Sequence, residues 1–378
     1  MLFGNKDIYR RLQKHLNKQP IGYPATLSGV ELRLLKRFFT PDEARLAINL
    51  SYKPNPLESI YDRVKESGLS FDDMVCLLDQ MMGKGVIGHF ERNGFRYFFN
   101  LPLVVGMYEG QLYRLTDKFL ADFDTYTAKM TFGLEFLGAK PPQMRTIPVG
   151  KSIKPEHHVT TYDRLIHLID ENDGTFVINE CICRKAAAIR GNPCRKTSRL
   201  ETCLALGDIA KNCVRSGVGR TISKNEAFDI TRQNESDGLV LQPSNTLKVD
   251  FICACCGCCC GMLRLHKALP KPLDFWSTNY YASVNSEACK GCGTCLKRCQ
   301  VGAIYMDETR DVSVVDLNRC IGCGNCVATC PSEAILLCKK PEESIPPETA
   351  EALLDCIMAN KKGTMGKAVL AAKLIMKK

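Results

Sequence analysis

The chain has 378 residues, 45% of them hydrophobic and 24% charged, which suits a soluble globular protein of two or three domains. Its 22 cysteines are far more than such a chain usually carries, and the opening residues lack the apolar core of a secretory signal. These features argue against a disulfide scaffold and predict metal-bound thiolates in a reducing, cytoplasmic compartment. No apolar run reaches the length of about eighteen residues that a membrane span requires.

Residues 1–28 are predicted to form a basic amphipathic N-terminal helix. Apolar residues recur at helical spacing among lysines and arginines: Ile8, Tyr9, Leu12 and Leu16. The pattern favours a surface helix packed on the domain behind it, and a membrane-surface anchor is the alternative.

Residues 29–105 are expected to hold three helices and a hairpin. The helices are predicted from Thr40 to Leu50, from Pro56 to Ser67 and from Ser70 to Met82, with Thr40 and Ser70 as caps. The Asn93-Gly94 pair between two strand-like runs then indicates a hairpin turn. This order resembles a winged helix, with the hairpin as the wing.

The charge of the third predicted helix indicates whether this domain binds nucleic acid or protein. It contains Asp72, Asp73 and Asp79, and no lysine or arginine precedes Lys84. Because an acidic helix repels phosphates, we expect a protein-contact or scaffold module, and nucleic acid is not expected as a partner. Cys76 on the apolar face of this helix is predicted to be a core residue.

Residues 106–150 are read as a helical connector, with a helix from Gln111 to Leu137 and an edge at Pro141-Pro142. A cysteine-rich middle α/β domain is expected over residues 151–284. It contains predicted strands at 176–180 and 247–253 and a helix that Ser223 caps.

Six cysteines fall within eight residues, 253–260, and without a metal such a run would oxidise readily. Strand alternation predicts that Cys253 and Cys255 share one site while Cys256, Cys258 and Cys260 face another. Together with upstream cysteines, the run is predicted to bind one or two further iron–sulfur clusters, with zinc or copper as the alternative. The candidate ligands are Cys181, Cys183, Cys194, Cys203, Cys253, Cys255, Cys256, Cys258, Cys259 and Cys260.

Cys255-Cys256-Gly257 resembles the CCG motif of heterodisulfide reductase subunits, which hold non-cubane clusters, although the flanking spacings do not match. From the Cys181-Ile-Cys183 segment onward, the layout resembles uncharacterised multi-cluster 4Fe–4S proteins of anaerobes. The resemblance implies an anaerobic host and adds little functional detail.

Two C-x2-C-x2-C-x3-C runs, each typical of a [4Fe–4S] cube, lie between residues 289 and 331. Three close thiolates on a glycine-rich loop can reach three corners of a cube, and the fourth cysteine, about one helical turn on, faces the other cluster. One cube is then assigned to Cys289, Cys292, Cys295 and Cys330, and the second to Cys320, Cys323, Cys326 and Cys299.

The segment from Asn285 to Leu337 resembles a bacterial-type two-cluster ferredoxin, and a ferredoxin domain is predicted over residues 285–340. The second motif keeps the family's proline as Pro331. The first has Gln300 at that place, which is expected to change only the exit from the loop. A pair of zinc knuckles is the alternative, but two tandem four-cysteine runs do not fit it.

Residues 341–378 are predicted to form a linker and a basic C-terminal helix. The stretch from Lys361 to Lys378 has six lysines and no acid. Docking on a partner is favoured over lying on a membrane, and peripheral contact with the inner membrane face through both basic termini stays open.

The whole is therefore read as an α+β, multidomain iron–sulfur protein that relays low-potential electrons to or from a partner oxidoreductase. The formal charge of +10 falls to about +6 with two clusters of about −2 each, which weakens the case for nucleic acid. The alternatives are a redox-sensing winged-helix transcription regulator and a reductase or activator subunit with a substrate-binding cluster. A non-catalytic carrier or an oxidoreductase subunit is favoured over an independent enzyme.

Overall fold

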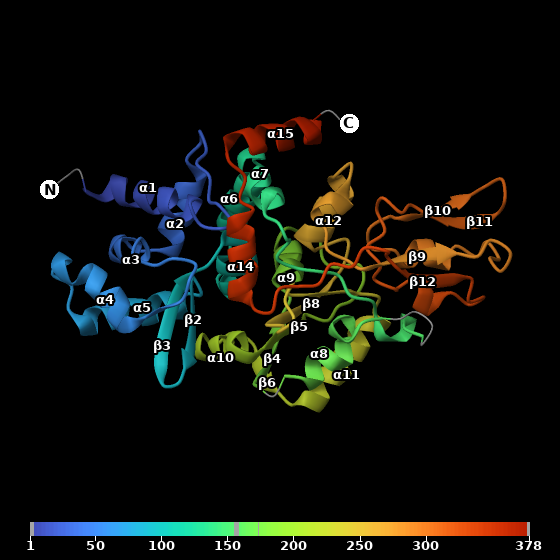
Figure 1. The fold of residues 1–378 in the computed structure, drawn as a ribbon, viewed down its shortest axis with the longest axis horizontal. Helices are drawn as coiled ribbons and strands as arrows, with labels where there is room; N and C mark the ends of the chain where they lie inside the picture. Colours follow the sequence, from blue (N-terminus) through green and yellow to red (C-terminus); the bar gives the residue numbers. More distant parts are fainter. Residues whose placement is uncertain (1–3, 155–158, 173, 376–378) are drawn as a thin grey trace. The chain divides into compact units, whose positions relative to one another are not determined.

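The computed structural model describes residues 4–154, 159–172 and 174–375. The chain divides into two compact units that are not two halves of the sequence (Figure 1). Among the described residues, the first unit comprises 4–140, 208–220 and 354–375, and the second comprises 141–154, 159–172, 174–207 and 221–353. Two later segments therefore complete the N-terminal unit.

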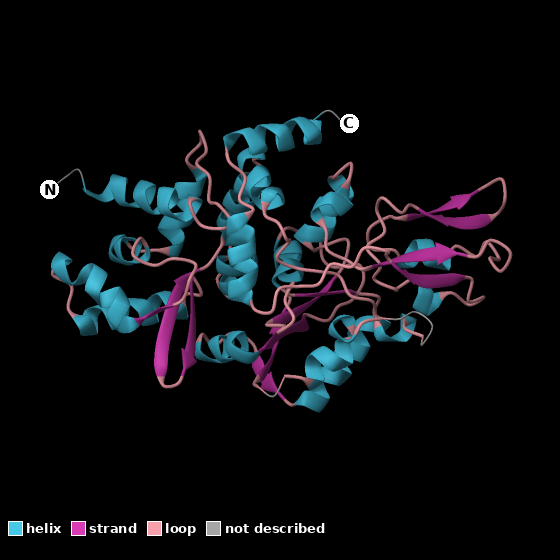
Figure 2. Cartoon of the chain, in the orientation of Figure 1, coloured by secondary structure: helices cyan, strands magenta, loops and turns pink. Residues whose placement is uncertain are grey.

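The first unit is mainly helical, with one small sheet (Figure 2). Its three strands run in the order β1-β3-β2, and all its pairs are antiparallel. The strands are β1 (Asn55–Pro56), β2 (Ile87–Arg92) and β3 (Phe95–Asn100). The helices of the N-terminal stretch are α1 (Gly4–Asn17), α2 (Val30–Phe38), α3 (Pro41–Ala47), α4 (Leu57–Val64), α5 (Phe71–Gly83), α6 (Asp117–Thr127) and α7 (Met130–Gly138).

The caps and the hairpin of this unit follow from short sequence signals. The Thr40 hydroxyl accepts a hydrogen bond from the Glu43 N–H, and the Glu43 carboxylate accepts one from the Thr40 N–H, so α3 begins with a capping box. Asn93 and Gly94 adopt φ of 53° and 77°, the left-handed values that a two-residue hairpin turn requires. The three predicted helices and the hairpin are confirmed, whereas the winged-helix resemblance stays a prediction.

Two expectations in this unit were wrong. Cys76 is exposed, because α5 buries Met74, Leu78 and Met81, and Cys76 lies off that face. The single helix predicted over 111–137 is instead α6 and α7, which Ala128 and Lys129 separate. Lys129 has an extended conformation, which ends the helical hydrogen-bond ladder there.

The two basic terminal helices both pack within this unit. On α1, the predicted apolar residues Ile8, Tyr9, Leu12 and Leu16 are all buried. Helix α15 (Thr364–Ile375) buries Leu370, and its Lys367 pairs with Glu135 of α7. Helix α14 (Ala350–Ala359) ends in the same unit, where Asp355 accepts a hydrogen bond from the Tyr52 hydroxyl at 2.8 Å. Helix α10 (Gly207–Arg215) adds Arg215, which pairs with Glu91.

The second unit is built on a five-stranded sheet in the order β6-β4-β5-β8-β7. The pairs β4–β5, β5–β8 and β7–β8 are antiparallel. The strands are β4 (Phe176–Glu180), β5 (Glu201–Leu206), β6 (Arg220–Ile222), β7 (Val240–Pro243) and β8 (Phe251–Cys255), and the helices of this region are α8 (Leu165–Asp170), α9 (Ile182–Ile189), α11 (Lys224–Ser236) and α12 (Gly261–Ala268). The strand predicted at 176–180 is confirmed, whereas the one predicted at 247–253 begins four residues later.

The two cysteine motifs of this unit lie in the loops between strands of two antiparallel pairs. Strand β9 (Tyr280–Val284) pairs with β12 (Ile335–Lys339), and β10 (Ile304–Asp307) pairs with β11 (Val312–Val315), both antiparallel. Strand β11 also lies against β9 (Figure 1). Between β9 and β10, the short α13 (Thr294–Arg298) follows the first cysteine loop, and a 3-10 turn (Val327–Thr329) follows the second. The chain is thus a mixed α+β protein.

Cysteines belong to the two larger apolar clusters in the core of the second unit. One cluster contains Ile178, Leu204, Leu241 and Ile252 of the sheet together with Cys256 and Cys259. The other joins Cys255 and Cys260 to Cys295, Cys320 and Cys326 of the paired motifs. The middle region and the paired motifs therefore share a core. Across the described ranges, the helices are all too short or too polar to cross a lipid bilayer.

A buried histidine on α12 predicts a pH dependence of stability. His266 is fully buried, with its ring edge-on to Trp276 at a centroid distance of 5.0 Å. Burial, with a smaller contribution from Arg319, lowers the pKa of His266 to about 4. Because an unfolded histidine takes up its proton near pH 6.5, the unfolded state binds the extra proton between about pH 6.5 and 4.

We therefore expect the free energy of unfolding to fall by about 1 kcal/mol between pH 7.5 and 5.5 through His266 alone. The His266→Phe variant should lack this increment. The measurement is the anaerobic thermal midpoint of both proteins at both pH values and one scan rate. An equal drop in the two proteins would show that His266 is not the group responsible.

Candidate metal centres

The cysteines of the first motif lie near the surface around β11. Cys292 is exposed, Cys289 is half-buried and Cys295 is buried. The Ser313 N–H donates to Cys289 Sγ at 3.5 Å, and the Ser313 hydroxyl lies 3.1 Å from Cys295 Sγ. The Ser313 and Gly291 N–H groups lower the pKa of Cys289 and the Thr294 hydroxyl lowers that of Cys292, whereas burial raises the pKa of Cys295. Donors aimed at sulfur stabilise thiolates, which are the form that binds iron.

The cysteines of the second motif, together with Cys299 of the first, form a more buried set. The charges of Cys299, Cys320 and Cys323 influence one another and Cys326, which places the four thiols in one neighbourhood. Burial raises the pKa of Cys323 to about 12 and that of Cys326 well above its usual value. The Ala282 N–H donates to Cys320 Sγ at 3.4 Å, and the Ala303 N–H donates to Cys299 Sγ at 3.2 Å.

The second cysteine loop has a glycine at position 322 because its backbone lies very close to that of Tyr280. Gly322 has φ of 62°, and a Cβ on it would lie 2.2 Å from the Tyr280 carbonyl oxygen. Only glycine fits this approach to the start of β9. The loop therefore wraps closely against β9, next to its sulfur ligands.

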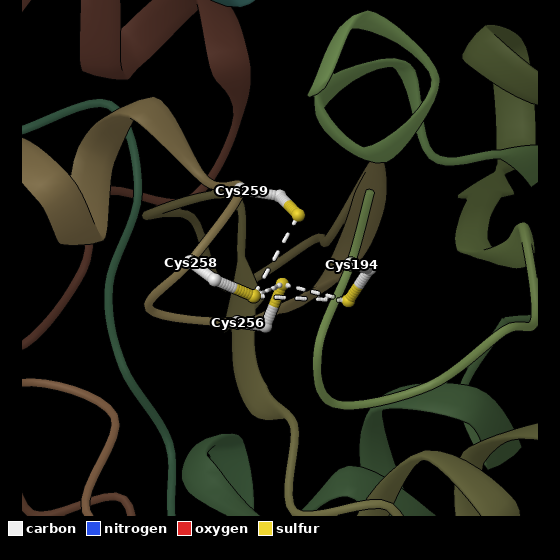
Figure 3. A group of neighbouring side chains, drawn as sticks. All are labelled: Cys194, Cys256, Cys258 and Cys259. Atoms are coloured by element: carbon white, nitrogen blue, oxygen red, sulfur yellow. Dashed lines mark hydrogen bonds between the residues drawn. The ribbon is translucent and has the colours of Figure 1, made fainter. Parts of the chain in front are cut away.

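A further four thiols converge outside the paired motifs (Figure 3). Cys194 comes from the loop after α9, and Cys256, Cys258 and Cys259 come from the turn between β8 and α12. All four Sγ atoms lie within 4.8 Å of one another. Cys256 Sγ lies 3.6 Å from Cys194 Sγ and 3.5 Å from Cys258 Sγ. We call these four side chains the four-thiol set.

The four-thiol set has the ligand number of a tetrahedral metal or of a cube. Cys256 and Cys259 are buried, whereas Cys194 and Cys258 are half-buried. Burial opposes ionisation, yet the N–H groups of Lys196 and Thr197 and the Cys256 thiol lower the pKa of Cys194 to about 7. The Lys196 N–H lies 3.5 Å from Cys194 Sγ. One thiolate therefore forms readily near neutral pH, and its exposure leaves it accessible to a metal.

The other six predicted ligands, Cys181, Cys183, Cys203, Cys253, Cys255 and Cys260, form a different group around the ends of β4, β5 and β8. Cys253 and Cys255 lie two residues apart on β8 and so on one face of that strand, and Cys256 and Cys258 belong to the four-thiol set. Cys260, which strand alternation groups with Cys256 and Cys258, lies outside the four-thiol set, and Cys183 and Cys255 shift its pKa. Strand β8 ends at Cys255, so alternation does not extend to Cys260, the cap of α12.

A buried arginine, which the sequence reasoning did not select, lies between the two groups of thiols. Arg184 is 1% exposed, and its guanidinium donates to the Thr202 hydroxyl and, at 2.9 Å, to the Ala254 carbonyl. Burial alone would lower the pKa of Arg184, but the facing thiolates raise it: Cys181, Cys256, Cys203 and Cys194. The side chain is therefore a fixed positive charge that faces both groups.

Gln300 does more than alter the exit from the first loop. Its buried side-chain carbonyl accepts a hydrogen bond from the Gly257 N–H at 3.0 Å, and its amide donates to the Gly238 carbonyl at 3.0 Å. In the second motif, Asn325 donates to the carbonyls of Gly238 and Leu239, both at 3.2 Å. In the sequence, the glutamine at position 300, where the ferredoxin pattern has proline, was the feature that could have indicated this contact.

Comparison with known proteins supports the paired motifs. Residues 281–331 match the family model of a 4Fe–4S dicluster domain. No match was found among curated proteins or among solved structures. The matched segment is a 4Fe–4S ferredoxin-like domain, and its eight motif cysteines fit the clusters that such a domain binds.

Proposed function

We propose that this protein is an electron-transfer protein that passes low-potential electrons between partner oxidoreductases through two [4Fe–4S] clusters and one or two more. The observation that carries the proposal is the four-thiol set, which shares a unit with the ferredoxin-like domain. Iron–sulfur clusters supply one-electron transfer when bound. The cysteines, amides and cations of the chain hold the clusters and tune their potentials.

The first motif supplies a surface for one partner. Cys292 is exposed, and the neighbouring Lys290 and Lys297 are exposed as well. Cations beside a cluster raise its potential and attract acidic proteins. An acidic redox partner that docks over this loop would come close to an exposed ligand of the cluster.

The Gln300 side chain provides a short connection from Cys299, a predicted ligand of the second cluster, to the four-thiol set. Cys299 is joined covalently to Gln300, and Gln300 accepts the hydrogen bond from Gly257, which lies between Cys256 and Cys258. The Gln300 side chain is buried where it meets the Gly257 backbone. Cys299 is therefore connected to Cys256 and Cys258 through the protein interior, without intervening solvent. This contact favours a relay in which electrons pass between the clusters, and it argues against two cofactors that work independently.

The test begins with iron and acid-labile sulfide on the full chain purified without oxygen. At least about twelve irons per chain are expected, eight in the paired motifs and four in the four-thiol set. The Cys194→Ser variant should lose about four. Cys76→Ser, which changes an exposed cysteine of the first unit, is the matched control and should lose none.

The second arm of the test is redox activity. Anaerobic titration with a low-potential viologen should reduce one electron equivalent per cluster, with signals of reduced clusters in the electron paramagnetic resonance spectrum. A total of about eight irons would leave the four-thiol set without a cluster. Clusters that stay unreduced throughout the titration would contradict electron transfer itself.

The alternative of a DNA-binding regulator has a direct test. Helix α5 exposes Asp72 and Asp73 at its start, so we expect binding to duplex DNA to be weak at physiological salt in both redox states. A submicromolar affinity that changes with cluster oxidation would favour the regulator instead.

A further inference from the structure

The six cysteines outside the four-thiol set come from strands β5 and β8 and from the starts of helices α9 and α12. Leu204 of β5 pairs with Ile252 of β8, which sets Cys203 beside Cys253. The Cys181 N–H, at the end of β4, donates to the Leu200 carbonyl just before β5 at 2.8 Å. The sheet register thus brings three of the six to one end of the sheet.

The other three cysteines are one further residue of β8 and two residues at helix starts. Cys255 follows Cys253 by two residues and so lies on the same face of β8. Cys183 is in the first turn of α9, and Cys260 is the residue before α12. Strand register and alternation thus bring Cys181, Cys203, Cys253 and Cys255 to one end of the sheet, Cys183 is two residues from Cys181, and Cys260 packs in the same apolar cluster as Cys255.

The six thiols are coupled in a closed ring. Each shifts the pKa of two others, in the order Cys181–Cys183–Cys260–Cys255–Cys253–Cys203 and back to Cys181. Cys181, Cys255 and Cys260 are buried, and the other three are half-buried. We call these six side chains the six-thiol ring.

The ring is separate from the four-thiol set, although the two alternate along the chain. Cys255 and Cys256 are consecutive residues, as are Cys259 and Cys260, and in each pair the two side chains belong to different groups. The run from Cys253 to Cys260 therefore contributes thiols to both groups.

Packing and charge both favour a metal in the ring. A buried cysteine is a common small hydrophobic residue, but six buried or half-buried cysteines gathered at one end of a sheet are more than packing alone explains. Arg184, whose hydrogen-bond acceptors are the neutral Thr202 hydroxyl and Ala254 carbonyl, faces Cys181 and Cys203 of the ring. A buried guanidinium requires a compensating negative charge, which metal-bound thiolates provide.

We propose that the six-thiol ring is a metal centre of its own that binds a polynuclear iron–sulfur cluster. Zinc and a single cube each use four thiolates, whereas the ring offers six, enough for a cluster of more than four irons. The centre is additional to the four-thiol set, so this inference extends the proposed electron-transfer function, on which it rests for the identity of the metal.

The experiment compares two double variants of the full chain, purified without oxygen. Cys203→Ser/Cys253→Ser changes the ring, and Cys194→Ser/Cys258→Ser changes the four-thiol set. Iron, zinc and sulfide are measured per chain, and Mössbauer spectra count the cluster types. The ferredoxin-like domain, with about eight irons, reports in each variant whether the chain has folded.

The wild type is expected to hold about sixteen irons or more. The ring variant should lose at least four and keep those of the four-thiol set, and the other variant should show the reverse. Iron unchanged in the ring variant, zinc in the ring, or the same irons lost in both variants would overturn the proposal.

A wild-type total of about twelve irons, four of them lost with the four-thiol set, would overturn the proposal even where the ring variant fails to fold. Metal content alone decides these outcomes. Failure of the electron-transfer function would instead appear as clusters that are present but cannot be reduced.

Discussion

Replacing Gly257 by alanine should remove iron from the four-thiol set and destabilise the second unit by about 3 kcal/mol. A Cβ on Gly257 would lie 2.1 Å from the Gln300 carbonyl oxygen and 2.7 Å from Lys267 Nζ. The lysine can move, but the carbonyl belongs to the backbone beside Cys299. The turn that carries Cys256 and Cys258 must therefore shift, and the Gly257–Gln300 hydrogen bond is lost with it.

Gly261 provides a matched control at the other end of the same run of cysteines. A Cβ there meets nothing within 4 Å, and the residue begins α12, where alanine is a better helix former. Gly261→Ala should keep the full iron content and gain up to about 1 kcal/mol. Iron content and the anaerobic thermal midpoint are measured on both variants, and a Gly257→Ala protein like the wild type in both would contradict the close contact.

The second large effect is expected from Arg184→Gln. Removing the cation leaves buried metal-bound thiolates without their counter-charge, which costs about 3–5 kcal/mol of stability by analogy with broken buried ion pairs. It should also make the nearby clusters harder to reduce. A unit charge several ångströms away at an effective dielectric of about 20 contributes about 2 kcal/mol, or about 90 mV for a one-electron couple.

Arg184→Lys separates charge from hydrogen bonding. Lysine keeps the positive charge but lacks the planar fork that reaches both Thr202 and Ala254. Its clusters should therefore keep potentials near the wild-type values while the thermal midpoint still falls. Redox titration of the three proteins tests this, and equal potentials in Arg184→Gln and the wild type would show that Arg184 does not act on the clusters electrostatically.

Local signals in the sequence predicted much of the fold. Thr40, Ser70 and Ser223 cap the helices that they were expected to cap, because a hydroxyl oxygen satisfies free N–H groups wherever the helix lies. The Asn93-Gly94 turn and the paired cysteine motifs were likewise predicted from local sequence signals. Each depends on a few consecutive residues and needs no knowledge of the rest of the chain.

Features that depend on distant residues could not be predicted in this way. Arg184 is an ordinary basic residue in the sequence, and only the return of β8 beside β5 buries it among thiols. Gln300 was treated as a minor departure because its partner, Gly257, is 43 residues away. The grouping of Cys260 required knowing that the strand ends at Cys255.

The division of the chain into two units is also a feature that could not be predicted from the sequence. Nothing in the composition of residues 208–220 indicates that they belong with the N-terminal helices. Their place follows from contacts such as that of Asn212, whose side-chain amide donates to the His89 carbonyl. Such contacts arise only when β2 and α10 have both formed.

The shared use of the Gly238 carbonyl bears on whether the ferredoxin-like segment is a portable module. Each cysteine motif directs one buried amide, Gln300 or Asn325, to this carbonyl, and Asn325 also donates to that of Leu239. Excising the segment would leave Gln300 with the more distant Arg298 carbonyl at 3.4 Å and Asn325 with Cys323 Sγ at 3.7 Å, so each amide would lose its better hydrogen bonds at a cost of about 0.5–1.5 kcal/mol. The segment is therefore an integral part of the larger fold, and a stand-alone version would need residues at positions 300 and 325 that do not require these acceptors.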